Sequence, residues 1–154
     1  MQAERLDDGT FVISCRMAST AEDVGATLAG LSDLLLAQVP DLSNENDWEL
    51  VIAEVLNNIV EHAYSDRPDG RIDMTLRFNA GHLLLEFIDS GLPMPRGTPP
   101  EGHHVDLDVA RNDLPEGGFG WFLIRSLSDS LTYRREGGKN HLTLTIPLSR
   151  GQHT

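Results

Sequence analysis

Cysteine and positive charge are both scarce in this chain of 154 residues. The single cysteine, Cys15, excludes a disulfide within the chain and a zinc cluster built from thiolates. Lys and Arg number 12 against 24 Asp and Glu, which gives a formal net charge of −12. Because so acidic a surface repels phosphate backbones and anionic lipid, direct binding to nucleic acid or to a membrane is not expected. The acidic excess instead favours protein partners that carry basic patches.

Long hydrophobic runs are absent as well. No stretch reaches membrane-spanning length, and the first eight residues contain no apolar signal core, so we expect a soluble, cytoplasmic protein. A hydrophobic content of 40% and a charged content of 23% are typical of a globular chain. With no internal repeat and no low-complexity tract, the sequence predicts one domain over residues 8–149.

Hydrophobic periodicity predicts three helices and five strands. A capping-box pattern, Ser19 with Glu22, predicts the start of a first helix that runs to about Val39. Trp48, Val51, Ile52, Val55 and Ile59 form the apolar face of the second, which ends before a turn cluster at residues 64–70. Strands are predicted at 11–17, 71–78, 82–89, 130–135 and 140–148. Helical spacing resumes at 120–129, which predicts the third helix.

Helices and mostly antiparallel strands in this order predict a two-layer α/β (α+β) sandwich. Residues 90–117 show no regular pattern, and this region holds five of the eight prolines. Loops of this length in compact domains usually serve as lids or binding segments.

A polar stripe on the second helix is the first candidate site. Glu54, Asn58 and His62 recur every four residues, so on an α-helix they lie along one line. A carboxylate and a carboxamide one turn apart can hold a hydrated divalent cation and orient a water or hydroxyl. The alternative is a solvated helix face that happens to carry these side chains.

Two glycine-containing segments are further candidates. Asp89 ends a strand, and Gly91 follows it; the carboxylate can accept from an exocyclic amine, and the glycine lets a flat ring approach the backbone. The same pattern also occurs in ordinary strand-to-turn connections. Gly117-Gly118-Phe119-Gly120 leads into a helix, whose N-terminal N–H groups suit phosphate. Its spacing fits neither a dinucleotide fingerprint nor a Walker loop, and the alternative is a hinge with a helix cap.

The order of the three segments resembles the GHKL ATPase superfamily, most closely the single-domain serine kinases that act as anti-sigma factors. The resemblance rests on Glu54-x-x-x-Asn58-x-x-x-His62, Asp89-x-Gly91-x-Pro93 and Gly117-Gly118-x-Gly120, with Asp129 and residues 137–144 also similar. It covers nearly the whole chain. It implies a Bergerat-type ATP-binding fold, in which a mixed, mostly antiparallel sheet is covered on one face by about three helices and a long ATP lid.

The resemblance also implies a role for each candidate residue. Glu54 is then the general base, Asn58 the ligand of Mg²⁺ on the ATP phosphates, and Asp89 the residue that fixes adenine, with Gly91 giving the ring room. Gly117, Gly118, Phe119 and Gly120 form the phosphate-binding segment, residues 90–117 the lid, and His62 orients or packs beside the site.

The implied function is an ATP-dependent serine/threonine kinase. It would sequester a sigma factor and phosphorylate a serine of a STAS-type anti-anti-sigma protein, as a homodimer. Related kinases often carry an Arg just before the Gly-x-Gly element, where this chain has Glu116 and Gly117, and Trp121 replaces a smaller residue. Arg111 or Arg125 could supply the missing charge. The alternative is a nucleotide-gated binding module with little kinase activity. The catalytic half of a histidine kinase is disfavoured, because no His-bearing dimerisation helix is recognised.

Overall fold

The computed structural model of the chain describes residues 1–44, 47–100 and 119–148. Its elements are, in order, β1 (Gln2–Arg5), β2 (Phe11–Ala18), α1 (Ala21–Gln38), η1 (Pro40–Asn44), α2 (Asp47–Asn58), η2 (Ile59–Ala63), β3 (Arg71–Asn79), β4 (His82–Asp89), α3 (Phe119–Leu127), β5 (Ser130–Glu136) and β6 (Lys139–Pro147). Of the two short helices, η1 is a 3-10 helix and η2 is one turn of π-helix. The described helices include none that is long and apolar enough to cross a membrane.

Six strands form one sheet in the order β1-β2-β3-β4-β6-β5. Each of the five pairings is antiparallel. Strand β6 lies between β4 and β5, and the register sets Asp89 opposite both Ile72 and Asn140. The last residue of β4 and the beginnings of β3 and β6 therefore meet at one end of the sheet.

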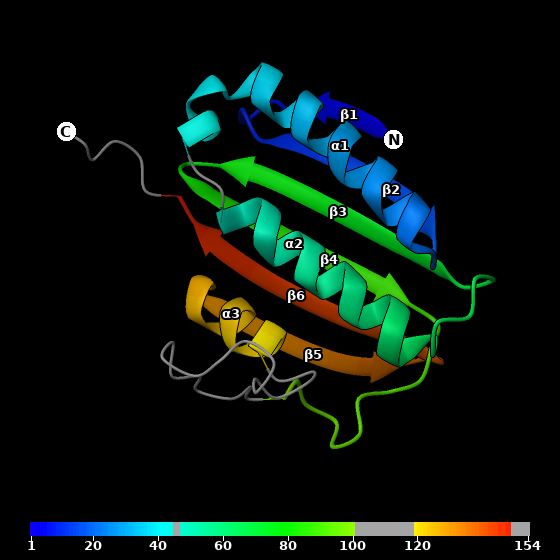
Figure 1. Cartoon of the computed structure of the whole chain (residues 1–154). Helices are drawn as coiled ribbons and strands as arrows, with labels where there is room; N and C mark the ends of the chain where they lie inside the picture. Colours follow the sequence, from blue (N-terminus) through cyan, green and yellow to red (C-terminus); the bar gives the residue numbers. More distant parts are fainter. Residues whose placement is uncertain (45–46, 101–118, 149–154) are drawn as a thin grey trace, which may run out of the picture.

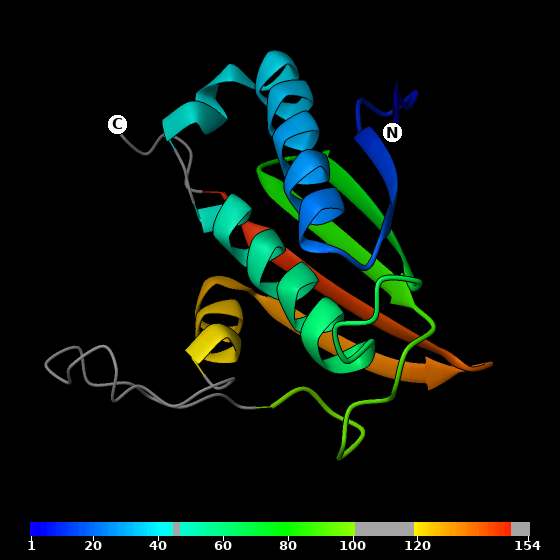
Figure 2. The same cartoon turned by 45° about the vertical axis from the view of Figure 1, so that its right-hand side comes forward.

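The helices α1, α2 and α3 cover the same face of this sheet, side by side and in that order from β2 toward β5 (Figure 1). In the turned view all three still lie on one side of the strands (Figure 2). The two-layer architecture predicted from the sequence is confirmed.

The apolar face of α2 packs into the layer between helices and sheet. Trp48, Val51, Ile52, Val55 and Ile59 are all at most 7% exposed, as the helical spacing predicts. They meet alternate residues of the strands, such as Ile72, Leu76, Leu85 and Phe87, none of which is exposed. Burying one side chain of this size contributes roughly 1.5–3 kcal/mol, so α2 is held firmly on the sheet.

Two local features differ from the sequence prediction. Strand β1 was not expected, because its four residues are all exposed and show no apolar alternation; its hydrogen bonds to β2 need no side-chain pattern. The N-cap of α1 is Thr20, whose side chain accepts from Asp23 N at 3.1 Å. The predicted cap, Ser19, is wrong because its Oγ is already taken, donating to Arg67 O and accepting from Gly70 N.

The predicted lid lies mostly outside the described residues. Residues 90–100 contain no helix or strand, as expected. Residues 101–117 are not described, so the lid stays a prediction.

Candidate active site

Glu54 and Asn58 lie on α2 where the first turn of α3 approaches it. A β-carbon built on Gly120 would lie 2.5 Å from Glu54 Oε1 and 3.7 Å from Asn58 Nδ2. Only a residue without a side chain lets the two helices come this close with Glu54 in its present rotamer. Three residues from two separate sequence segments, Glu54, Asn58 and Gly120, therefore meet at one place.

Glu54 is partly buried at this contact. Loss of hydration raises the pKa of its carboxyl group above the ordinary value, and the negative charge of Glu61, which lies in η2, raises it further. A carboxylate with a raised pKa is a stronger proton acceptor. The position therefore suits a general base better than an ordinary surface glutamate would.

Asn58 is the last residue of α2, and its Nδ2 atom is buried. No described residue accepts a hydrogen bond from that atom. Leaving a buried amide unpaired costs about 1–3 kcal/mol, which a bound group could recover. Its orientation is not fixed by the described residues, so the oxygen is free to face a cation.

His62 departs from the stripe that the sequence predicts. The α-helix ends at Asn58, and the π-turn η2 carries His62. Because a π-turn takes more residues per turn than an α-helix, the regular four-residue spacing is interrupted between Asn58 and His62. The side chain of His62 is exposed, and within the described part of the chain no hydrogen bond or ion pair joins it to Glu54 or Gly120. Its role stays a prediction.

Asp89 is 5% exposed at the end of β4. Its Oδ1 accepts from Gly91 N at 2.9 Å and from Asn140 Nδ2 at 2.7 Å. Burial raises the pKa of Asp89, while these two hydrogen bonds and the charges of Arg135 and His141 lower it in part. No donor from the described residues reaches Oδ2, which leaves that oxygen for a ligand.

Gly91 is glycine for a reason that the sequence does not reveal. A β-carbon there would collide with the main-chain carbonyl of Ala63, whose carbon would be 2.6 Å away. The next residue, Leu92, donates from its backbone N to the same carbonyl oxygen at 2.7 Å. On its Cβ side the missing side chain therefore makes room for the end of η2 and leaves no space for a base. This contact brings the Asp89 end of the sheet against the helix that carries Glu54.

The model of the histidine kinase-like ATPase domain matches residues 17–146, which include α2, β4 and α3. The chain belongs to this family. The resemblance predicted from the three sequence segments is thereby confirmed.

Several curated proteins are similar to the chain. The serine/threonine-protein kinase BtrW of Bordetella bronchiseptica is 37% identical over 95 residues, covering 60% of the chain and 63% of BtrW. The chain thus spans less than two thirds of that relative. The serine-protein kinase RsbW of Oceanobacillus iheyensis is 27% identical, with 82% of the chain and 80% of the relative covered. The anti-sigma F factor of Clostridium beijerinckii is 22% identical, with coverages of 82% and 86%.

A solved structure shares the fold. The crystal structure of the RsbU and RsbW domains of a Mycobacterium tuberculosis protein superimposes with a TM-score of 0.57 at 20% identity. The match covers 89% of this chain and 32% of that one.

Among the described residues, α3 offers no arginine side chain that is free to bind a phosphate. Arg125 donates from Nε to Pro100 O and from Nη2 to Pro99 O, both at 2.8 Å. It therefore holds residues 99–100 against α3. Arg111, Gly117 and Gly118 lie outside the described residues, as does the side chain of Phe119, the first residue of α3. Trp121 is 4% exposed and packs in the core.

Sequence reasoning assigned no role to three residues that support Asp89, namely Tyr133, Arg135 and Asn140. Their hydrogen bonds link the β5–β6 hairpin to Asp89, Gly91 and Met94. The only sequence signal was that residues 137–144 resemble the family. Antiparallel pairing of β4 with β6 is needed to bring Asn140 next to Asp89.

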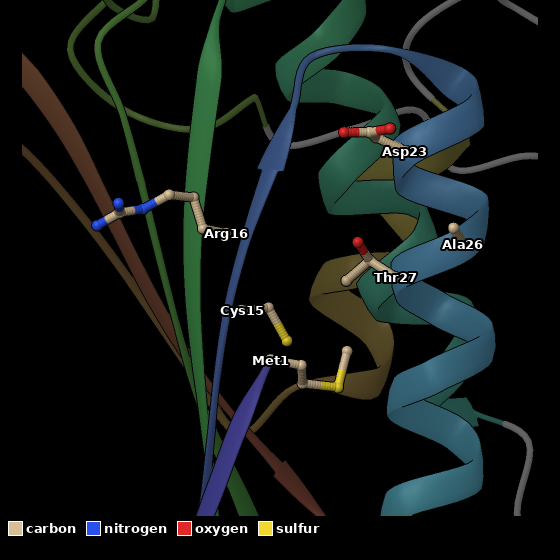
Figure 3. Close-up of a pocket in the computed structure, with 6 residues that line it drawn as sticks. All are labelled: Met1, Cys15, Arg16, Asp23, Ala26 and Thr27. Carbon is tan, nitrogen blue, oxygen red and sulfur yellow. The ribbon is translucent and has the colours of Figure 1, made fainter.

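A cavity of about 250 Å³ lies elsewhere, between β2 and α1 (Figure 3). It is lined by Met1, Cys15, Arg16, Asp23, Ala26 and Thr27. Burial raises the pKa of the Cys15 thiol, which keeps it protonated and weakly nucleophilic. None of the lining residues belongs to α2, β4 or α3, so this cavity is separate from the candidate site.

Proposed function

We propose that the chain is an ATP-dependent serine/threonine kinase that acts as an anti-sigma factor in a partner-switching system. The observation that carries the proposal is the meeting of Glu54 and Asn58 with Gly120 at the start of α3. The similarity to the serine kinases BtrW and RsbW supports a kinase, and the similarity to the anti-sigma F factor supports the regulatory role.

The polar groups of the site fit ATP and Mg²⁺. Asp89 Oδ2 can accept from the amino group of adenine, and the Asn58 carboxamide can offer its oxygen to Mg²⁺, a cation that takes few protein ligands and keeps several waters. The backbone N–H groups at the start of α3, at Gly120 and in the preceding Gly117–Phe119, can bind phosphate. When bound, ATP supplies the phosphoryl group and Mg²⁺ neutralises developing negative charge.

Glu54 performs the proton transfer in this proposal. Its carboxylate accepts the proton of the serine hydroxyl as the hydroxyl oxygen bonds to the terminal phosphorus and ADP departs. The Gly120 contact excludes one side of the carboxylate from water, which makes it a better base. His62, within the π-turn η2, orients or packs at the edge of the site.

The partners are a sigma factor, which the protein sequesters, and a STAS-type anti-anti-sigma protein, whose serine it phosphorylates in the cytoplasm. A phosphoserine adds charge to the docking surface and so breaks the second complex. A homodimer is the proposed working form.

The kinase assignment is tested with radiolabelled ATP and STAS-domain proteins of the same organism. Replacing Glu54 by Gln should leave Mg-ATP affinity near that of the wild type but lower phosphoserine formation by about 10²–10⁴-fold. Asn58→Ala should abolish Mg-ATP binding, measured by calorimetry, with an unchanged circular dichroism spectrum. Unchanged phosphorylation by Glu54→Gln would refute the general-base assignment.

One observation favours the alternative of a nucleotide-gated binding module. Arg125 is held by two carbonyls, and the residue pair before Gly118-x-Gly120 is Glu116-Gly117. If the wild type binds Mg-ATP and its STAS partner but forms no phosphoserine, the gated module replaces the kinase.

A further inference from the structure

Asn140 lies at the start of β6, and every hydrogen-bonding position of its side-chain amide has a partner. It is 4% exposed. Its Nδ2 donates to Asp89 Oδ1 at 2.7 Å and to Leu92 O at 2.9 Å. Its Oδ1 accepts from Tyr133 Oη at 2.5 Å and from Arg135 Nη1 at 3.0 Å. A carboxamide can make four such bonds, and Asn140 makes all four.

These partners fix which way the amide faces. Tyr133 and Arg135 offer donors, so the oxygen of Asn140 must point toward them and the NH₂ group toward Asp89. The two supporting residues are themselves anchored, since Arg135 also donates to Gly91 O at 2.6 Å and Tyr133 accepts from Met94 N at 3.0 Å. Asn140 therefore presents a donor to Asp89 at all times.

As a result, the two carboxylate oxygens of Asp89 have different environments. Oδ1 accepts from both Asn140 and Gly91 N, while Oδ2 receives no donor from the described residues. A carboxylate held in this way can only accept at its free oxygen. A base with an amino group there is bound, whereas a base with a carbonyl there meets a second acceptor and is rejected.

We propose that Asn140 is a positioning residue that reserves Asp89 Oδ2 for an amino-group donor and thereby selects adenine over a 6-oxopurine. The inference rests on the proposed nucleotide site and assigns its base specificity to a residue outside the three segments that resemble the family. It also ties the base-reading carboxylate to the first residues of the following loop, through Leu92 O and Gly91 O.

The electrostatics of Asp89 support this role. Burial raises its pKa, and the Asn140 hydrogen bond is the largest of the effects that lower it. Among the described residues, Arg135 on β5 and His141 on β6 are the groups whose charge lowers the pKa of Asp89, so both also favour its ionised form. Without Asn140 the carboxyl group would hold a proton to higher pH. A protonated carboxyl can donate to a carbonyl, so discrimination between the two bases would fall.

The test compares Mg-ATP with Mg-ITP, whose base carries a carbonyl where adenine carries the amino group, by calorimetry. The wild type should prefer ATP by about 10- to 100-fold, as expected for one hydrogen bond to a charged group. Asn140→Asp has nearly the same shape but sets a second carboxylate against Asp89, and the preference should fall at least about tenfold. Asn140→Ala removes the donor without adding charge and should lose the preference as well.

The pH profile separates positioning from packing. Wild-type ATP affinity should rise with pH as Asp89 ionises and then stay level. In Asn140→Asp two adjacent carboxyls share one proton at low pH, so ATP affinity should fall as pH rises between about 5 and 8. A loss that came only from poorer packing would lower ATP and ITP affinity together and leave the direction of the pH profile unchanged.

Asn79→Asp is the matched control. Asn79 also ends a strand and hydrogen bonds through its side-chain amide, to Thr10 Oγ1 at 2.8 Å, but at the far end of β3. It should keep the wild-type ATP preference. If Asn140→Asp does not fold, as judged by circular dichroism, Asn140→Ala carries the test. A wild-type ATP preference in the folded Asn140 variants overturns the inference, whereas a wild type that binds neither nucleotide overturns the proposed function itself.

Discussion

Glu54 shows a conflict between stability and chemistry at the scale of one residue. Folding moves its carboxyl group out of water and beside Gly120, and this raises its pKa. The ionised form is therefore less favourable in the folded chain than in the unfolded one. The strength as a base that the proposed mechanism requires comes at a cost in folding free energy.

Replacing Glu54 by Gln should therefore stabilise the protein at neutral pH. A carboxyl group with a raised pKa contributes most to stability below its unfolded pKa, and that contribution is lost as pH rises through the unfolded and then the folded value. The gain at pH 7 should be below about 1 kcal/mol, because Glu54 is only partly shielded. For a domain of this size that corresponds to a rise in Tm of at most about 2–4 °C. Thermal unfolding at pH 7 and near pH 4 measures it, with the gain disappearing at the lower pH.

The control is Glu4→Gln, which removes one negative charge from an exposed residue of β1. Any general benefit of lowering the net charge of −12 appears in both variants. An equal rise in Tm for Glu4→Gln and Glu54→Gln would show that burial of Glu54 plays no part.

Gly91 and Gly120 show that the identity of a residue does not reveal which contact requires it. The sequence predicts that Gly91 and Gly120 both serve the ligand. The structure gives each a separate contact, Gly91 with the Ala63 main chain and Gly120 with the Glu54 side chain. A clash with a backbone carbonyl cannot relax, whereas a glutamate side chain can rotate. Spacing in the sequence does not distinguish these cases, because both contacts are between residues distant along the chain.

At the scale of elements, the π-turn η2 and the end of β4 are joined through Tyr64. This residue follows η2 and is 5% exposed. Its hydroxyl donates to Arg71 O at 2.6 Å and accepts from Ser90 N at 2.8 Å. One hydroxyl thus connects the helix carrying Glu54 to the beginning of β3 and to the residue after Asp89.

Tyr64→Phe should loosen this junction without emptying the core. It leaves the carbonyl of Arg71 and the N–H of Ser90 without their partner, at a cost of about 1–3 kcal/mol. We expect a lower free energy of unfolding in urea and faster amide exchange at residues 90–92. Tyr133→Phe is unsuitable as a control, since Tyr133 supports Asn140; Phe78→Leu, on β3 away from the junction, is suitable. Unchanged exchange at Ser90 in Tyr64→Phe would contradict the proposed link.

The sequence predicted those elements whose side chains carry a strong period. The apolar face of α2 and the polar–apolar alternation of β3, β4 and β6 each extend over most of the element, and the structure confirms them. Strand β1 was missed because its four residues are all exposed and show no apolar alternation. The π-turn was missed because one extra residue in a helical turn leaves no mark on composition.

The residues of the candidate site likewise fall into those that the sequence predicted and those that it did not. Glu54, Asn58, Asp89 and Gly120 were identified because their types and spacing carry chemistry, and the fold brings three of them, Glu54, Asn58 and Gly120, into contact. The supports of Asp89 were not, because Tyr133, Arg135 and Asn140 act through pairings set by the β4–β6–β5 order. That order is a property of the folded sheet.

At the scale of the whole molecule, charge is divided between the two faces. Strand residues alternate between the helix-covered face and the open face. The basic residues of the open face, by register, are Arg16, Arg71, Arg77, Arg134 and Lys139, against the acidic residues Glu4, Asp73, Glu86 and Glu136. The open face of the sheet is therefore nearly neutral, although the chain carries −12 overall. Among the described residues, the acidic excess lies mainly on the helices.

Association with the proposed sigma-factor partner should accordingly be steered by the helix side and weaken with salt. Oppositely charged surfaces raise association rates. At 0.1 M salt, ions largely screen the attraction between charges that are more than about 10 Å apart. We expect the association rate, measured by stopped-flow fluorescence, to fall about tenfold between about 50 and 500 mM NaCl. Asp33→Lys, an exposed change on α1, should lower the rate several-fold at low salt, whereas Glu4→Lys on the open face should change it little. If the field is concentrated on the helix side, a charge reversal on that side should change the rate more than one on the open face. Equal effects of the two substitutions would mean that only the net charge matters.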